Sequence, residues 1–309
     1  MTTRPTWLVT GANGFLGANV GAFLAGRAER IGAVRRPTEP DAVFDRYLAS
    51  DLEDPVALVR AIEELRPDVV LHAAAMASHE ACEADPQKAR LVNAWASEAL
   101  ARAAARAGSR FVLISTDAVF DGARGHYAED AETSPTSVYG RTKLEGEQLV
   151  ASATDALIVR TNFFGWSPTG RRSILEFFVN ALSNGEQIRG FTDFTTSSAY
   201  AQVVAESLWD LTAAGATDVV HLTSPDAMTK YDFGVAVADE FGLDAALITP
   251  TRSDIQPSRE GDISLDVSRA QALLGRGLPT MRVGIARAAA DTATRRAVRL
   301  APGPSDSAQ

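Results

Sequence analysis

A tyrosine and a lysine stand four residues apart in the stretch "SVYGRTKLEGE" (137–147). Residues with this spacing share one face of a helix, and Tyr139 and Lys143 lie at the start of a predicted helix over 138–151. A phenol with its ordinary pKa near ~10 is a poor acid or base at neutral pH. A nearby ammonium favours the phenolate and lowers that pKa, toward the range where proton transfer is efficient. The pair alone is weak evidence, because a core tyrosine beside a solvated lysine has the same spacing.

A glycine-rich loop near the N-terminus indicates what such a pair would act with. In "WLVTGANGFLGANV" the glycines follow a predicted strand and precede a predicted helix. Glycines permit a tight turn and a close approach of the backbone to a pyrophosphate, and the free amides of a helix N-terminus bind phosphate. This context is the one that the dinucleotide-binding motif requires. We expect cofactor contacts from the loop residues Gly11, Asn13, Gly14, Phe15, Leu16 and Gly17.

The second predicted strand ends in two arginines, Arg35 and Arg36. An acidic residue near this point accepts the ribose hydroxyls of NAD, whereas arginine accommodates the 2′-phosphate of NADP. The pattern therefore favours NADPH, with NADH as the alternative if the arginines are ordinary surface charges. An aspartate after the third strand could bond the adenine, and small residues after the fourth would let the chain pass close to the cofactor. These further predicted contacts are Asp51, Leu52, Ala73, Ala74 and Ala75.

The stretch "FVLISTDAVFDG" (111–122) adds a third group to the tyrosine and lysine. It is predicted to be a buried strand with Thr116 at its carboxyl end, where ligands of open α/β sheets bind. Reduction of a ketone by hydride needs a proton for the developing alkoxide, which Tyr139 would supply. Lys143 can also hold the nicotinamide ribose, and Thr116 can orient the substrate oxygen. We therefore predict Thr116, Tyr139 and Lys143 as the catalytic residues and as parts of one site, with the last two also contacting the cofactor.

Short apolar runs alternate with longer amphipathic runs through the first half of the chain. Such alternation indicates right-handed crossovers and a parallel sheet covered on both faces, which is a doubly wound, Rossmann-like α/β fold. Strands are predicted at 7–10, 31–34, 47–49, 69–73, 111–115, 157–160 and 218–224, and helices at about 15–26, 55–65, 86–107, 138–151, 173–185 and 198–211.

The pattern is less regular after residue 161. We expect a dinucleotide-binding domain over 1–161 plus about 196–224, and a smaller mixed α/β cap that binds the substrate over about 162–195 and 225–300. The tail 301–309, "APGPSDSAQ", lacks apolar periodicity and is predicted to be disordered.

Composition limits the class of protein. The 309 residues carry a formal net charge of −9, which argues against a nucleic-acid surface. No run approaches the ~18 apolar residues of a membrane span, and we expect no membrane association. The single cysteine, Cys82, excludes an intrachain disulfide and a multi-cysteine metal site, and it fits a reducing compartment. We therefore expect a cytoplasmic protein.

The chain resembles the extended short-chain dehydrogenase/reductases and, within them, the dTDP-4-dehydrorhamnose reductase family. The resemblance covers most of residues 6–285 and is carried in order by "TGANGFLG", "RPDVVLHAAA", "VNAWASEALARAA", "ISTDAVFDG", "YAED", "SPTSVYGRTKLEGE" and, less closely, "SREGDISLD". It implies NADPH-dependent reduction of the 4-keto group of a nucleotide-activated 4-keto-6-deoxysugar, with the nucleotide sugar as partner and a homodimer as one form of assembly. In the family the motif S-T-D-x-V-F-D-G supplies the catalytic threonine, which here is Thr116.

The same catalytic residues serve reductases, epimerases and dehydratases of nucleotide sugars. Similar dehydratases carry Asp-Glu after the threonine, whereas here Asp117 is followed by Ala118, which argues against dehydration. A 4-epimerase stays open as an alternative, although such enzymes usually hold NAD. A non-catalytic NADP-binding regulatory subunit, like that of a methionine adenosyltransferase, is the alternative from another class.

Three positions depart from the family pattern. Phe163 replaces a tryptophan, Arg259 begins "REG" where the family has R-P-x, and Asn19 replaces a glutamate that some members use for magnesium. Metal dependence therefore does not transfer, no metal site is predicted, and the sugar can differ from the rhamnose precursor. His79 and Glu80 are weaker candidates for the sugar pocket, Arg172 for the phosphates, and His72 is expected to pack. The predicted substrate contacts are Asp117, Ala118, Asn162, Phe163, Arg171 and Arg259.

Overall fold

The computed structural model describes residues 4–37, 39–253 and 261–300. Two expectations from the sequence fall outside this part of the chain, the substrate contact from Arg259 and the disordered tail over 301–309. Among the described residues, no helix combines the length and the apolar character needed to cross a membrane.

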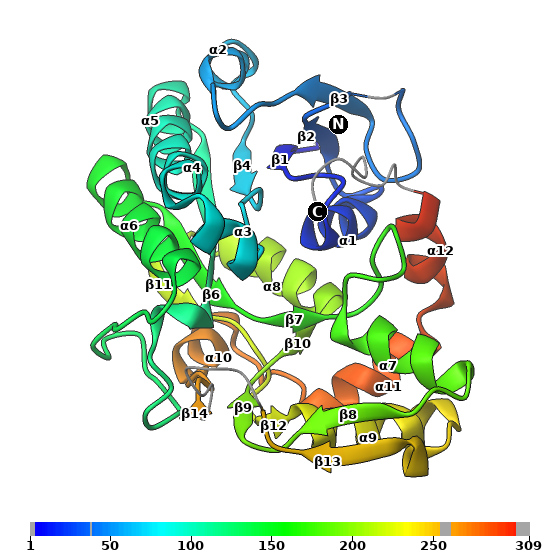
Figure 1. Ribbon diagram of the computed structural model, residues 1–309. Helices are drawn as coiled ribbons and strands as arrows, with labels where there is room; N and C mark the ends of the chain where they lie inside the picture. The colour runs from blue at the N-terminus through cyan, green and yellow to red at the C-terminus, as the bar shows by residue number, and fades with distance from the viewer. Residues whose placement is uncertain (1–3, 38, 254–260, 301–309) are drawn as a thin grey trace.

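A seven-stranded parallel sheet forms the centre of the molecule, in the order β3-β2-β1-β4-β5-β6-β11 (Figure 1). The predicted doubly wound, Rossmann-like sheet is therefore confirmed. The six strands expected before residue 161 are present with ends within two residues of the prediction, and the strand expected over 218–224 ends at His221. The strands are β1 Thr6–Thr10, β2 Glu29–Val34, β3 Arg46–Ala49, β4 Val69–His72, β5 Arg110–Thr116, β6 Leu157–Thr161 and β11 Asp218–His221.

Alternate residues of the strands face opposite layers of helices, as the period of a strand requires. Val70 and Leu113 pack with the helices of one layer, whereas Leu71 and Ile114 pack with those of the other. Figure 1 shows the two layers on opposite sides of the sheet. One layer contains α2 Val56–Leu65, α5 Ala96–Ala107 and α6 Val138–Ala153, and the other contains α1 Phe15–Leu24 and α8 Ala201–Ala213.

The helix predicted over 86–107 is continuous but irregular. It consists of α4 Pro86–Arg90, a π-helical turn Leu91–Trp95 and α5. The Asp85 side chain accepts a hydrogen bond from the Lys88 amide at 2.9 Å and Pro86 occupies the first turn, which confirms the predicted helix start. A short helix before it, α3 His79–Ala84, was not predicted; Ser78 caps it by accepting a hydrogen bond from the Ala81 amide at 3.2 Å.

The later part of the chain builds three small sheets beside the central one, in the lower part of Figure 1. They pair β7 Phe163–Phe164 with β10 Ala199–Tyr200, β9 Phe194–Thr196 with β12 Met228–Thr229 and β14 Gly261–Asp262, and β8 Ile188–Phe191 with β13 Ile248–Thr251. The accompanying helices are α7 Ile174–Ser183, α9 Lys230–Phe241, α10 Ser268–Leu274, α11 Met281–Ala290 and α12 Thr292–Leu300.

The predicted helix over 198–211 begins three residues late, at Ala201, because Ala199 and Tyr200 pair with β7 as a strand.

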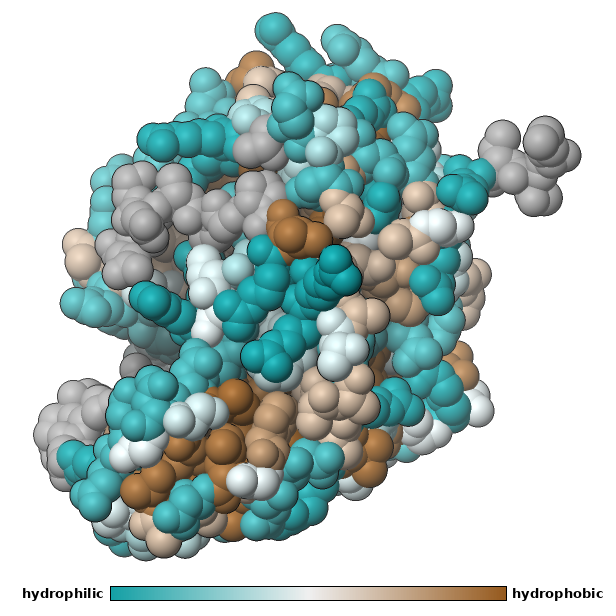
Figure 2. Space-filling model, turned by 90° about the vertical axis from the view of Figure 1, so that its right-hand side faces the viewer, coloured by the Kyte–Doolittle hydropathy of each residue, from teal (hydrophilic) through white to brown (hydrophobic). Residues whose placement is uncertain are grey.

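The surface of this later part of the chain also carries apolar side chains. Figure 2 shows them gathered over its lower half, where α7, α9 and α11 lie. Phe177 of α7 and Val283 of α11 are 41% and 47% exposed.

Candidate active site

The glycine loop joins β1 to α1 at the centre of the sheet. Gly11 has φ +65°, and a Cβ there would lie 2.9 Å from the Cα of Ala74. A Cβ on Gly17 would lie 2.2 Å from the Gly11 carbonyl oxygen. Because both positions leave no room for a side chain, the loop turns tightly against the segment after β4. This is the close helix–strand packing that the dinucleotide motif uses.

The N-terminus of α1 suits an anion. Gly14 precedes the helix and provides no side-chain cap, and the first turn contains no acidic residue. The first amides of a helix have no partner within it, and they carry the positive end of the helix dipole. Asn13 and Phe15 are partly exposed beside them, whereas Leu16 is buried in the core. The loop therefore fits the pyrophosphate of a dinucleotide.

Arg35 and Arg36 directly follow β2, and both are exposed. Within the described residues, neither side chain forms a hydrogen bond or an ion pair, so both are available to a phosphate. Lys88 lies close enough to Arg35 for the two positive charges to repel each other. Lys88 forms an ion pair with Glu53 at 2.6 Å. This arrangement fits the 2′-phosphate of NADP.

The other predicted cofactor contacts follow β3 and β4. Asp51 is exposed, and its Oδ1 accepts a hydrogen bond from the Glu53 amide at 2.9 Å. Leu52 is buried against α2 and Ala73–Ala75 are partly exposed. The structure therefore brings these residues to the same edge of the sheet as the glycine loop.

His72 packs at the end of β4, as expected. It is 1% exposed, with Nδ1 2.7 Å from the Thr10 hydroxyl and Nε2 3.0 Å from the Ser97 hydroxyl. Burial lowers the pKa of His72 to about 3, and the Lys143 charge adds to this effect. A neutral imidazole therefore fixes the loop, since Thr10 also accepts a hydrogen bond from the Ala74 amide.

Thr116, Tyr139 and Lys143 lie together at the carboxyl end of β5. Thr116 is its last residue, and Ser137 caps α6 so that Tyr139 lies in the first turn. A Cβ on Gly140 would lie 2.2 Å from the Ala118 carbonyl oxygen, so this glycine lets α6 pack directly on the strand tip. The Tyr139 phenol lies close to the Thr116 side chain, and Lys143 donates from Nζ to the Ile114 carbonyl at 2.7 Å.

The expected lowering of the Tyr139 pKa is not found in the chain by itself. Burial raises the pKa of Tyr139 to about 12; the Thr116 hydrogen bond opposes this rise, and the charge of Asp117 adds to it. Burial also lowers the pKa of Lys143 to about 8, with Glu147 opposing. The prediction was wrong because it considered the ammonium alone. The cost of burying a phenolate dominates, and the ammonium is bonded to a backbone carbonyl.

A buried ion pair supports α6, the helix that carries Tyr139 and Lys143, and it was not predicted from the sequence. Arg160 on β6 bonds Glu147 on α6 with 2.7 Å between Nη2 and Oε2, and both residues are nearly fully buried. The Ser115 hydroxyl also donates to Glu147, and Arg160 reaches His221 on β11 at 3.4 Å. The available signal was the spacing, since Glu147 follows Lys143 by four residues on the same helical face.

Asp117 and Asn162, two predicted substrate contacts, bond each other. Asn162 donates from Nδ2 to Asp117 Oδ2 at 2.8 Å, and Asp117 is 4% exposed. Ala118, which is partly exposed, follows in a short 3-10 turn. Phe163 contacts the glycine loop, with its ring 5.1 Å from that of Phe15.

The segment 165–172 contains no helix or strand. Arg171 and Arg172 are exposed on it and available to an anionic ligand, but among the described residues no hydrogen bond or ion pair links their side chains to Thr116, Tyr139 or Lys143. Trp166 is 1% exposed and donates from Nε1 to the Ala288 carbonyl at 2.9 Å, so this aromatic residue packs. Asn19 is also buried and donates to the Trp166 carbonyl at 2.8 Å.

His79 lies beside Tyr139, with 5.0 Å between the ring centroids, whereas Glu80 is exposed.

Cys82 is fully buried and donates to the Met76 carbonyl at 3.2 Å. The thiol therefore serves packing.

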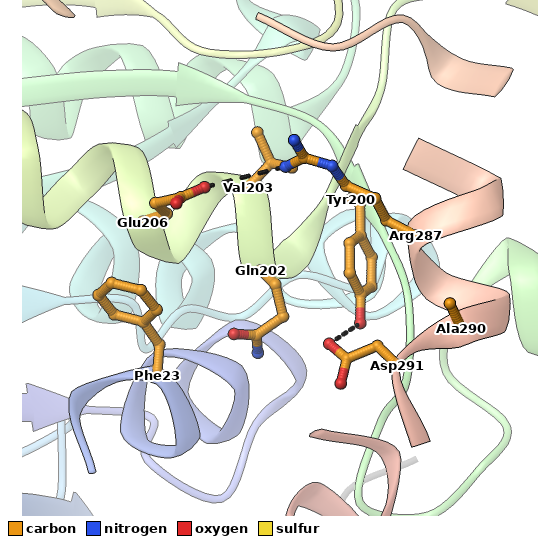
Figure 3. A pocket seen from close by; sticks show the side chains of 8 residues that line it. All are labelled: Phe23, Tyr200, Gln202, Val203, Glu206, Arg287, Ala290 and Asp291. Atoms are coloured by element: carbon orange, nitrogen blue, oxygen red, sulfur yellow. Dashed lines mark hydrogen bonds and ion pairs between the residues drawn. The ribbon is translucent and has the colours of Figure 1, made fainter. Parts of the chain in front are cut away.

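A separate cavity of about 370 Å³ lies between α1, α8 and α11 (Figure 3). It is lined by Phe23, near the C-terminal end of α1, and by none of the predicted site residues. Its polar groups pair with one another: Tyr200 donates to Asp291 at 2.9 Å, and Arg287 lies 3.9 Å from Glu206. The candidate active site is therefore separate from this cavity and lies at the carboxyl ends of the strands, where Thr116, Tyr139 and Lys143 meet.

The seven-stranded sheet and its glycine loop define a dinucleotide-binding α/β protein. The family model described as the RmlD substrate binding domain matches residues 6–294, and the chain belongs to this family.

Relatives of known name agree with this membership. The chain is 34% identical over 291 residues to the "Probable low-salt glycan biosynthesis reductase Agl14" of Haloferax volcanii, covering 90% of this chain and 95% of that protein. It is 33% identical to the dTDP-4-keto-6-deoxy-D-glucose reductase of Streptomyces niveus, covering 82% and 84%. The methionine adenosyltransferase 2 subunit beta of Xenopus tropicalis is 30% identical, covering 90% and 85%.

Solved structures share the fold. A hypothetical dTDP-4-dehydrorhamnose reductase from Sulfolobus tokodaii superimposes with a TM-score of 0.77 at 30% identity, covering 88% of this chain and 96% of that one. A dTDP-4-dehydrorhamnose reductase from Bacillus anthracis, solved in complex with NADP, gives 0.80 at 20% identity, covering 94% and 100%. The second likeness shows the fold alone.

Proposed function

We propose that this chain is an NADPH-dependent reductase of the 4-keto group of a nucleotide-activated, dTDP-linked 4-keto-6-deoxysugar. The observation that carries this proposal is the placement of Thr116, Tyr139 and Lys143 together at the carboxyl end of β5. Its family relatives include reductases named for this class of substrate. NADH is the alternative cofactor.

In the proposed reaction the carbonyl carbon gains a hydride and the carbonyl oxygen gains a proton, which gives an alcohol. NADPH, when bound, supplies the hydride. Tyr139 gives its phenolic proton to the oxygen and is left as a phenolate. Thr116 orients the oxygen by a hydrogen bond. Lys143 holds the nicotinamide ribose, and its charge favours the phenolate.

The remaining site residues are proposed by position. Gly11, Asn13–Gly17, Asp51, Leu52 and Ala73–Ala75 line the cofactor, and Arg35 and Arg36 bind its 2′-phosphate. The segments 162–195 and 225–300 form the substrate-binding part, with Ala118, Asn162, Phe163 and Arg171 toward the sugar nucleotide. We also propose a cytoplasmic location and a homodimeric assembly; the location rests on the single buried cysteine, which suits a reducing compartment.

The test is NADPH oxidation by the purified protein with a panel of dTDP- and other nucleotide-linked 4-keto-6-deoxysugars. We expect turnover with a dTDP-linked member and a product that carries an alcohol at C4. The Tyr139→Phe variant should lose kcat by at least about 100-fold, because proton transfer contributes this much, while its Kd for NADPH stays within about twofold. Retained turnover in this variant would refute the assignment of the acid.

One other function has a specific observation in its favour, the 30% identity to a methionine adenosyltransferase subunit. A regulatory subunit would bind NADPH, reduce no sugar in the panel and co-purify with a second enzyme. A 4-epimerase would interconvert two sugars without net consumption of NADPH. Each outcome differs from stoichiometric NADPH oxidation, so the same assay separates the three functions.

A further inference from the structure

One buried carboxylate connects the catalytic threonine to the later part of the chain. Asp117 directly follows β5, and both of its oxygens accept hydrogen bonds from protein groups. Oδ1 accepts from the Thr116 hydroxyl at 3.1 Å. Oδ2 accepts from Asn162 Nδ2 at 2.8 Å and from the Thr196 hydroxyl at 3.0 Å. These donors lie at the ends of β5, β6 and β9, which belong to two different sheets.

The contacts fix the direction of the Thr116 proton. A hydroxyl has one hydrogen to donate and two lone pairs that accept. The Thr116 oxygen accepts from the Ala118 amide at 3.1 Å, while its proton points to Asp117. In this arrangement Thr116 cannot donate to a carbonyl oxygen. It can do so only when the hydroxyl turns away from Asp117 or when Asp117 donates to it.

The other two donors lie at the two ends of the segment 162–195, where the sugar is proposed to bind. Asn162 separates β6 from β7, and its Oδ1 accepts from the Ser198 hydroxyl at 3.1 Å. Thr196 ends β9, the middle strand of the β12-β9-β14 sheet. A displacement of β9 on binding the sugar would therefore change the hydrogen bonds of Asp117 and, through them, the partner of the Thr116 proton.

We propose that Asp117 is a positioning residue that couples the sugar-binding segments to the Thr116 hydroxyl, in place of a direct contact with the substrate. This inference rests on the proposed reductase function. The nearly complete burial of Asp117 agrees with it, since the carboxylate has no free oxygen to offer a ligand. Burial also raises the pKa of Asp117, and the three hydrogen bonds oppose that rise.

The test is a double-mutant cycle on kcat with Asp117→Asn, Thr116→Val and their combination. Asp117→Asn keeps the shape but cannot accept all three hydrogen bonds. We expect kcat to fall about 10- to 100-fold, as misplacement of a reacting group does, with the Kd for NADPH unchanged. If Asp117 acts through Thr116, adding Asp117→Asn to Thr116→Val should change kcat by less than about twofold.

Wild-type turnover is measured first and decides the proposed function. With that turnover present, an Asp117→Asn variant that matches the wild type, or a double variant slower by the product of the two single effects, overturns the coupling. Should Asp117→Asn fail to fold, Thr196→Val replaces it in the same cycle. We expect it to lower kcat roughly three- to tenfold in the wild-type background and to have no effect beside Thr116→Val. An equal effect in both backgrounds overturns the inference.

Discussion

At the scale of single residues, burial controls the chemistry of the site more than the pairing of charges does. Tyr139 and Lys143 share one helical face, yet the pKa of each is shifted away from its charged form by burial. The backbone carbonyl of Ile114 holds the ammonium, so its bond goes to the strand and not to the phenol. With a pKa of about 12, Tyr139 keeps its proton at neutral pH, which is the form that the proposed proton donor needs.

The titration of Lys143 has a measurable effect on stability. Its pKa falls from 10.5 to about 8 on folding, so between these pH values the unfolded chain binds more protons than the folded one. Stability therefore rises with pH across this window. We expect the free energy of unfolding of the wild type, minus that of Lys143→Met, to increase from pH 8 to pH 10.5 by on the order of 3 kcal/mol. Urea unfolding at several pH values measures it, and a difference that stays constant would contradict the buried ammonium.

Arg35 and Arg36 determine the choice of cofactor in our proposal. Changing both to alanine removes the charges available to the 2′-phosphate, each hydrogen bond to a charged group contributing about 1.5–3 kcal/mol. We expect the Kd for NADPH to rise at least about tenfold and the Kd for NADH to change less than about threefold, as followed by fluorescence titration. Arg60→Ala, on α2, is the control. Equal losses for the two cofactors would exclude the phosphate contact.

At the scale of elements, glycines set how closely α6 approaches the sheet. Gly140 lies against the Ala118 carbonyl, and Gly146 lies against the Asn93 carbonyl, where a Cβ would be 2.5 Å away. Asn93 belongs to the π-helical turn between α4 and α5 and bonds both Met76 and Thr142. The catalytic helix is therefore positioned by backbone contacts on both sides.

Gly140→Ala tests this positioning. The new methyl group would overlap the Ala118 carbonyl, so α6 must move away from the tip of β5. We expect a loss of about 1–3 kcal/mol in unfolding free energy, as overpacking causes, and a fall in kcat larger than the change in the Kd for NADPH. Gly277→Ala is the matched control, because its Cβ would meet only Gln271 Oε1 at 3.6 Å. A Gly140→Ala enzyme with wild-type stability and kcat would show that the contact does not position the helix.

For the molecule as a whole, helix α12 contacts the loop before α7 and holds it in place. Arg295 of α12 lies 4.2 Å from the centre of the Trp166 ring, and Arg299 lies 3.4 Å from the buried Glu176. Glu176 also accepts hydrogen bonds from Ser167. Residues near the end of the chain thus hold the segment that carries Arg171 and Arg172.

The double change Arg295→Ala and Arg299→Ala should loosen this loop. We expect roughly 1–3 kcal/mol of lost stability, from one cation–π contact and one buried carboxylate left without its cation, measured by thermal unfolding. Arg296→Ala, an exposed neighbour on the same helix, should change stability by less than about 0.5 kcal/mol. A similar loss of stability in Arg296→Ala would mean that the effect comes from the helix itself and not from its contacts with the loop.

Whether a feature could be predicted from the sequence depended on how far apart its contacting residues lie in the chain. The turn from β1 through Gly11 to α1 and the pairing of Tyr139 with Lys143 are local, and their residues alone indicate them. The partners of Asp117, Glu147 and Trp166 lie up to 147 residues away in the chain, so no local pattern reveals them. The helix α3 was missed because it spans only six residues, too few for an amphipathic period.

Strand β11, at the edge of the sheet, affects how the chain can fold during its synthesis. Strand β11 joins the sheet beside β6 only after sixty further residues have been added, and His221 then reaches the guanidinium of Arg160. Until the ribosome has released that segment, the edge of β6 has no neighbouring strand. The ion pair of Arg160 and Glu147 beside α6 then lacks its contact with His221. A nascent chain stopped at residue 161 would contain Thr116, Tyr139 and Lys143, the proposed catalytic residues, and still be an unfinished, aggregation-prone sheet.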